Sequence, residues 1–260
     1  MKHITKYILL VFPLIFIYNC GEPLMDYGIN TQTPVVESYL QENSNILTVK
    51  VFSMEEYLID DFKLSKPIQS LNIKVNNHTL QETSSGTYIL NLETDTLRER
   101  QTFNLQFEHN GKSIEASTTI PAPISNLKAD PESLELSYSY GWGFSDTTEV
   151  IISWDDPDNS YYQVYIESPN VTDVPSFGIF GRRMMQPFKG NSYRASARDF
   201  RSAGAHWIYV YRVNKDYVEL YERISSSDLA NPVSSIQNAF GIFTSMSFAR
   251  VRIIVYESEE

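Results

Sequence analysis

The sequence has few of the residues on which catalytic and metal sites most often depend. It contains one cysteine and four histidines in 260 residues, and no two histidines stand at the spacing of paired metal ligands. We therefore expect His78, His109 and His206 to be surface residues. No Gly-x-Ser-x-Gly elbow occurs, and Gly178–Arg183 lacks the strand-to-helix context of a phosphate loop. The sequence predicts a protein that is not an enzyme and that holds no cofactor or metal.

Basic residues are also scarce. The chain has 21 Lys and Arg residues against 32 Asp and Glu residues, a formal net charge of −11. A body of this charge repels phosphate backbones and anionic headgroups. We therefore expect no nucleic-acid partner.

The N-terminal apolar run is too short to span a membrane. Tyr7–Ile17 falls below the roughly 20 residues that a spanning helix needs, and Lys2 and Lys6 precede it. This order is typical of a secretory signal peptide. The single cysteine, Cys20, follows where a lipoprotein signal peptidase would cut and where its sulfur accepts a diacylglycerol. We predict a signal peptide over residues 1–19 and lipidation of Cys20, with a buried free thiol as the alternative.

The processed chain would be acidic and free of disulfides. Loss of residues 1–19 leaves 19 basic and 32 acidic residues, a net charge of −13. Acyl chains on Cys20 would anchor it in lipid, because each buried methylene contributes about 0.8 kcal/mol. Residues 20–33 have no hydrophobic periodicity, which predicts a tether.

From Pro34 onward, short runs rich in β-branched and aromatic residues alternate with turn residues. Asn110-Gly111 between two such runs is a strong hairpin signal. We expect six or seven strands before Pro121-Ala122-Pro123, among them Val35–Leu40, Ile46–Phe52, Thr87–Leu92, Thr102–His109 and Ile114–Ile120. This spacing predicts a β-sandwich of the immunoglobulin or prealbumin-like sort over residues 34–121.

Residues 124–260 resemble a fibronectin type III module, with Trp154 in its core. The strands expected there are Leu127–Tyr138, Glu149–Trp154, Tyr161–Glu167, His206–Val213 and a closing strand over Ala249–Val255. Residues 169–203 show little alternation, and we interpret them as a long insertion of the kind that often carries function.

One helix is expected in this second half. Apolar side chains recur at helical spacing over residues 216–226, and Asp216 with Glu219 fits an N-cap and capping box. Ser225–Phe243 is predicted to be mostly loop. The fold class is therefore mainly β: two sandwiches, the second with an insertion and one helix.

The carboxylates Asp155, Asp156 and Asp158 form the one dense acidic cluster. Calcium binds several such oxygens on a turn, but Pro157 interrupts the usual alternation. We favour a solvated turn between strands over a calcium site.

Basic residues are concentrated in the predicted insertion, which contains Arg182, Arg183, Lys189 and Arg194. Charge balance for a solvated loop is one interpretation. The other is that these residues contact an acidic partner or ligand.

Aromatic residues are the other excess, with 17 Tyr, 14 Phe and 3 Trp. Trp142 and Phe144 stand between glycines and are candidate contact residues, with a packed strand edge as the alternative. Asp95-Thr96-Leu97 and Asp146-Thr147-Thr148 resemble sites of bacterial O-glycosylation, which makes Thr96 and Thr147 candidates for it.

Several segments resemble a family of uncharacterised Bacteroidota outer-membrane lipoproteins that are often encoded beside TonB-dependent receptors. The matching segments are Pro34–Leu40, Gly86–Tyr88, Thr118–Pro121, Trp154–Pro157, Tyr161-Tyr162, Asn231-Pro232 and Ser235–Phe243. The resemblance implies a lipid-anchored accessory of such a receptor in ligand capture or uptake. We expect it on the cell-surface side of the outer membrane, with the periplasmic side as the alternative. A structural or adhesive envelope lipoprotein is the second interpretation.

Overall fold

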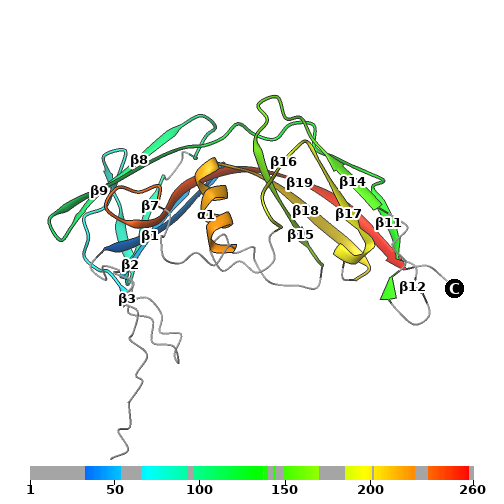
Figure 1. Ribbon diagram of the computed structural model, residues 1–260, viewed down its shortest axis with the longest axis horizontal. Helices are drawn as coiled ribbons and strands as arrows, with labels where there is room; N and C mark the ends of the chain where they lie inside the picture. The colour runs from blue at the N-terminus through cyan, green and yellow to red at the C-terminus, as the bar shows by residue number, and fades with distance from the viewer. Residues whose placement is uncertain are drawn as a thin grey trace, which may run out of the picture.

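The protein is mainly β in a computed structural model, which describes residues 33–53, 66–92, 96–136, 138–139, 143–144, 149–169, 185–200, 202–225 and 234–257. The predicted signal peptide, Cys20 and the tether up to residue 32 lie outside these residues. In the part that is described, no helix is both long enough and apolar enough to cross a bilayer. The described residues form an arch, with one sandwich at each end and helix α1 between them (Figure 1).

The first sandwich lies at one end of the arch. Its strands are β1 (Pro34–Gln41), β2 (Ile46–Ser53), β3 (Lys66–Pro67), β4 (Lys74–Val75), β5 (His78–Thr79), β6 (Gln81–Ser84), β7 (Thr87–Asn91), β8 (Thr102–His109) and β9 (Lys112–Thr119). One sheet has the order β1-β2-β7-β6, and the facing four-stranded sheet has the order β5-β4-β8-β9. The runs predicted to be strands each contain one, and β8 has the predicted bounds. The short strands β3, β5 and β6 were not predicted, so nine strands are described where six or seven were expected. Asn110 and Gly111 both have positive φ in the predicted hairpin turn.

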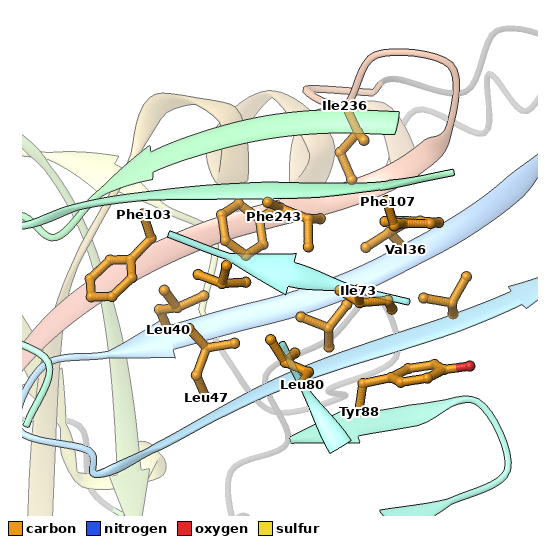
Figure 2. Packing of buried hydrophobic residues seen from close by; sticks show 14 of the residues in the cluster. Val36, Leu40, Leu47, Ile73, Leu80, Tyr88, Phe103, Phe107, Ile236 and Phe243 are labelled. Carbon is orange, nitrogen blue, oxygen red and sulfur yellow. The ribbon is translucent and has the colours of Figure 1, made fainter. Parts of the chain in front are cut away.

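Aliphatic and aromatic side chains fill this first core. Inward residues of β8, such as Leu105, alternate with exposed polar ones. Val36, Leu40, Leu47, Ile73 and Phe103 point toward one another between the two sheets (Figure 2).

The second sandwich has fibronectin type III strand order, as predicted. Its strands are β10 (Lys128–Asp130), β11 (Ser133–Leu136), β14 (Glu149–Ser153), β15 (Tyr161–Glu167), β16 (Phe188–Lys189), β17 (Ser192–Ser196), β18 (Gly204–Val213) and β19 (Phe240–Glu257). The three-stranded sheet β10-β14-β17 faces β16-β15-β18-β19. Trp154 lies in the core, as expected, together with Tyr162 and Val164, and Ile166 packs against it. β12 (Tyr138–Ser139) and β13 (Gly143–Phe144) form a separate hairpin.

The predicted insertion over residues 169–203 is wrong for residues 185–200. These residues form β16, β17 and the 3-10 turn η1 (Ala197–Asp199), and β17 pairs with β14 as a strand of the sandwich. Small side chains hide the alternation, because the buried positions in β17 and at the start of η1 are Ala195 and Ala197. Residues 170–184 lie outside the described part.

Strand β19 belongs to both sandwiches. Over 18 residues it pairs in parallel with β1 at Val35–Gln41, antiparallel with β18, and in parallel with β11. It therefore joins the two halves into one ten-stranded sheet. The predicted bounds 34–121 are too narrow for the first core, because Ile236, Ala239 and Phe243 pack into it.

Gly241 permits the close approach of β19 to β1. Its φ is +94°, and a Cβ at this position would collide with the carbonyl oxygen of Val36. Only glycine fits both constraints without strain.

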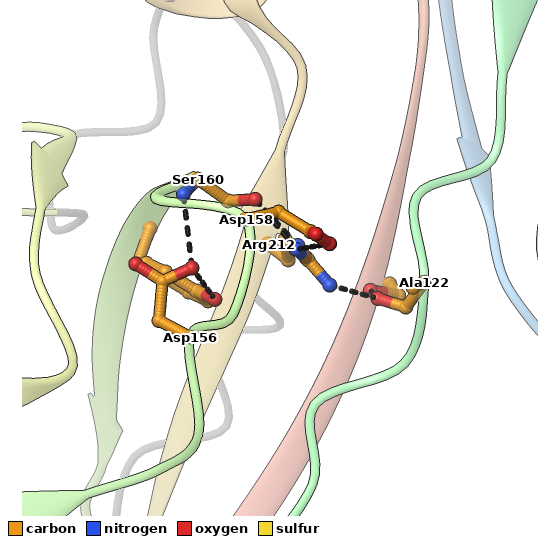
Figure 3. A network of polar contacts seen from close by, with 7 residues as sticks. Ala122, Asp156, Asp158, Ser160 and Arg212 are labelled. Atoms are coloured by element: carbon orange, nitrogen blue, oxygen red, sulfur yellow. Dashed lines mark hydrogen bonds and ion pairs between the residues drawn. The ribbon is translucent and has the colours of Figure 1, made fainter.

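A polar cluster fastens the two sandwiches where they meet. Arg212, nearly buried, donates to Asp158 at 2.7 Å and to the Ala122 carbonyl at 3.2 Å (Figure 3). Asn214 donates to Thr118 Oγ1 at 3.1 Å and to Ser245 Oγ at 3.0 Å. The segment between the two predicted sandwiches, residues 121–123, is therefore held to the second sandwich by the hydrogen bonds that the Ala122 carbonyl accepts from Arg212 and Ser247.

Helix α1 (Lys215–Ser225) begins one residue before its predicted start. Asp216 lies inside the first turn, so it is not the N-cap. Its carboxylate accepts from the Thr244 hydroxyl and from the Tyr217 N–H, each at 2.9 Å. Burial raises the pKa of Asp216 above its ordinary value.

Candidate functional site: an aromatic face on the second sandwich

The outward side of the sheet β16-β15-β18-β19 carries most of the unusual side chains. Because strand residues alternate between faces, Ile208 and Val210 enter the core while their neighbours on β18 point outward. We define the aromatic face by Tyr161, Tyr165, Trp207, Tyr209, Tyr211 and Phe248.

The rings of this face contact one another across the strands. Tyr211 and Phe248 are cross-strand partners with ring centroids 5.8 Å apart, and both stack on Tyr209, at 6.2 and 6.1 Å. Tyr165 lies 6.0 Å from Tyr209. Each such pair contributes about 0.5–1.5 kcal/mol beyond area burial, so the rings are held in place before any partner arrives.

Exposure rises along this face. Helix α1 packs at one end, where Tyr165, Tyr211 and Tyr217 form a buried cluster with Ile242 and Met246. Further along, Trp207, Tyr209 and Phe248 are half-buried, and Arg250 and Arg252 are exposed. The face therefore changes from a packed core to an accessible surface.

Hydrogen bonds fix the packed end. Gln163, completely buried, accepts from the Tyr217 hydroxyl at 2.9 Å and donates to the Met185 carbonyl at 2.8 Å. Burial raises the pKa of Tyr217 to about 12, so this hydroxyl stays protonated and donating at neutral pH. The helix is thus bonded to the sheet as well as packed on it.

Arg250 organises the accessible end. Its guanidinium carbon lies 4.3 Å from the Trp207 ring centroid and 5.9 Å from that of Tyr209. It donates to the Tyr209 hydroxyl at 3.2 Å, and that hydroxyl donates to Glu167 at 3.0 Å. A cation over a ring contributes about 0.5–1 kcal/mol at an exposed site. Trp207, Tyr209 and Arg250 therefore form a preorganised cluster.

The predicted basic residues are divided by the structure. Lys189 is opposite Tyr161 in the sheet, and its Nζ lies 4.8 Å from that ring, so it extends the aromatic face. Arg194 is on the other sheet, where it pairs with Glu149 at 3.0 Å. Arg182 and Arg183 lie outside the described residues.

Most of the remaining candidates fall wholly or partly outside the described part of the chain. Trp142 and Thr147 lie outside the described residues, and of Phe144 only the backbone is described, in β13. Thr96 is half-buried next to the fully buried Leu97.

The acidic turn serves the fold. Asp155 accepts from Asn126 at 2.5 Å, and Asp156 accepts from the Ser160 N–H and the Tyr162 hydroxyl. Asp158 pairs with Arg212. The three carboxylates thus have separate partners, and no cluster of three potential metal-ligating residues occurs within the described ranges.

The prediction that His206 is a surface residue is wrong. It lies on the inward side of β18, completely buried, with its ring 5.2 Å from Phe200. Nε2 donates to the Ser202 carbonyl at 2.7 Å. Burial lowers the pKa of His206 below its ordinary value of 6.5.

No protein-family model matches the chain, and none of the curated proteins matches it. Solved structures with a similar strand layout include a cytokine receptor complex (12% identity, 84% of this chain and 95% of that one, TM-score 0.27). Domains A168–A170 of titin (11%, 87% and 66%, TM-score 0.21) and the two-domain DIP-gamma structure (9%, 88% and 99%, TM-score 0.20) are others. These likenesses are too distant to transfer any property to this chain.

Proposed function

We propose that this chain is a non-enzymatic binding lipoprotein, anchored in the outer membrane through Cys20 and accessory to a TonB-dependent receptor. The aromatic face is the surface that contacts the receptor. The lipid anchor and the receptor class rest on the N-terminal sequence and on the family resemblance.

The observation that carries the contact surface is the cluster of Trp207, Tyr209 and Arg250. Trp, Tyr and Arg are the residues that most often dominate binding energy in protein interfaces. Here they are half-buried or exposed, and they are already ordered by stacking and by hydrogen bonds. Binding therefore loses little side-chain entropy at this surface.

A shared membrane favours the complex further. Confinement of both partners to one bilayer raises their effective concentration, so a modest interface stays occupied. Arg250, Arg252 and Lys189 give this face a basic character on an otherwise acidic protein, which suits an acidic patch on the receptor.

The contact surface is tested by affinity purification in mild detergent with a tag after Glu260. The wild-type protein should recover an outer-membrane β-barrel, and Trp207→Ala with Arg250→Ala should weaken the complex roughly thirtyfold, as expected for hot-spot residues. Arg194→Ala removes an exposed arginine from the opposite sheet and should have no effect. Undiminished recovery with the double variant would exclude this face. Recovery of the wild-type protein alone would favour the structural or adhesive interpretation.

The anchor is tested separately with Cys20→Ser. This variant should stay uncleaved or lose membrane retention, because no sulfur accepts the diacylglycerol. Acyl labelling and membrane fractionation measure both effects. Normal processing and retention of the serine variant would refute lipidation.

A further inference from the structure

A hollow lies on the surface of the first sandwich, away from the aromatic face. It encloses about 380 Å³ on the outward side of the sheet β5-β4-β8-β9. Its lining residues are all of polar types and come from β4, the following turn and β8: Lys74, Asn76, Asn77, Thr102, Asn104 and Gln106.

The floor of this hollow is rigid. Asn76 donates from its side chain to the Thr102 carbonyl at 3.0 Å and accepts from the Asn104 N–H at 2.8 Å. Its carboxamide thus continues the β4–β8 ladder beyond the end of β4. The Thr102 hydroxyl lies 2.9 Å from that of Thr119. Under this floor, Leu105 is buried in the first core.

Other lining groups are available to a ligand. Within the described residues, the side chains of Lys74, Asn77 and Gln106 have no hydrogen-bond or ion-pair partner. Each carboxamide both donates and accepts, and the ammonium only donates. A ligand in this hollow would therefore contact hydrogen-bond donors and acceptors that lie side by side on the rigid β4–β8 floor.

The chemistry of the lining selects the ligand class. No apolar wall is present to bury a hydrophobic molecule, and no carboxylate is present to hold a cation. A single ammonium is a weak basis for phosphate recognition, for which several charged or backbone donors are usual. Adjacent hydroxyl groups, which donate and accept in turn, match paired carboxamides best.

We propose that this hollow binds a sugar unit of a polysaccharide through Asn77, Asn104, Gln106 and Lys74. The inference is independent of the receptor contact, because the two surfaces lie on different sandwiches. A negative result in the test of the receptor contact would therefore leave the sugar-binding proposal unaffected.

Affinity electrophoresis of the processed protein, in gels that contain dextran, laminarin or alginate, tests the proposal. At least one polysaccharide should retard the protein. Asn77→Ala with Gln106→Ala should weaken that retardation by roughly fivefold for each lost hydrogen bond. Gln81→Ala, which removes an exposed carboxamide from β6 on the other sheet, should not.

Three results would overturn the proposal: no retardation by any of the three polymers, retardation unchanged in the double variant, or retardation by alginate alone that depends only on Lys74. Should the double variant fail to fold, side-chain amide NMR signals of the wild-type protein give the answer. Those of Asn77 and Gln106 should shift on titration with oligosaccharides of the retarding polymer, and unshifted signals would refute the site.

Discussion

The side chains that point outward from β8 in the first sandwich are Thr102, Asn104 and Gln106, whereas those from β18 in the second include Trp207, Tyr209 and Tyr211. The inward side chains show the opposite contrast, because they are apolar in β8 and partly polar in β18. The inward side chains of β8 are Phe103, Leu105 and Phe107, whereas inward positions of β18 hold His206 and Arg212 together with Ile208 and Val210.

This inversion shows what each sandwich is suited to contact. A hydrated outward face exchanges water for ligand hydroxyls at little cost, and such contacts stay wet. A stacked aromatic face gains free energy only where a partner removes water from it. The aromatic face lies on the ten-stranded sheet and the hollow lies on the four-stranded sheet that faces it in the first sandwich, so one frame presents two surfaces of different chemistry.

The largest expected effect comes from breaking that frame at Gly241. Gly241→Ala places a Cβ against the Val36 carbonyl at positive φ, so we expect the free energy of unfolding to fall by at least about 3 kcal/mol. Gly111→Ala is the matched control, because its φ is also positive and nothing lies near the added atom. It should cost about 1 kcal/mol. Urea titrations measure both values. If the two variants lost the same free energy of unfolding, β19 would not approach β1 closely at Gly241.

Local patterns were enough to predict the longer strands of the first sandwich and the helix, but not the short strands β3, β5 and β6. In β8 the alternation is complete, and Asn110-Gly111 defines the hairpin turn. The span of β19 was not predictable, because its partner β1 is far away in the sequence. Small or polar residues such as Gly241, Ser245 and Ser247 hide its buried part. Burial of such residues depends on a neighbour that no local pattern reveals.

The candidate site was predictable only in part. Lys189 was identified as a contact residue and does border the aromatic face, whereas Arg194 lies on the other sheet. Trp207, Tyr209 and Tyr211 alternate within a predicted strand with the apolar Ile208 and Val210, which face the other side. A strand that is apolar on both faces is a signal that one face has a second partner. That signal identifies the face, but not the position of α1 on it.

The next largest effect on the free energy of unfolding is expected for Arg212, the buried cation of the second sandwich. Arg212→Met should lower the free energy of unfolding by about 1–3 kcal/mol, because the donors to Asp158, Ser160 and the Ala122 carbonyl are lost. The cost stays moderate because Asp158 is 65% exposed and remains solvated. Lys215→Met, which removes the exposed i,i+4 pair with Glu219, should cost under about 0.5 kcal/mol. Similar costs would mean that Arg212 does not fasten the sandwiches.

Acid should affect stability through the interior of the second sandwich. The folded pKa of His206 lies below the ordinary 6.5, so below that pH the unfolded state binds more protons. The contribution of His206 to the free energy of unfolding is therefore fully present above about pH 6.5. It falls as the pH decreases, by up to about 1.4 kcal/mol per pH unit. His206→Gln should flatten thermal unfolding midpoints between pH 7 and 5. His78→Gln, at an exposed position of the first sandwich, should leave the profile unchanged. A profile that His206→Gln does not alter would contradict the assignment.

The smallest effects separate the two faces most cleanly. Tyr209→Phe keeps the stacked ring but removes the hydroxyl between Arg250 and Glu167, and Thr102→Val removes a hydroxyl from the hollow on the first sandwich. Both positions face outward, so each change should alter the free energy of unfolding by under about 0.5 kcal/mol. Their binding effects should differ. Tyr209→Phe should weaken receptor recovery severalfold and leave polysaccharide retardation intact, because Arg250 loses its fixed position. Thr102→Val should do the reverse. If either variant impaired both readouts, the two faces would not be independent, and the difference in their chemistry would not mark a division of roles.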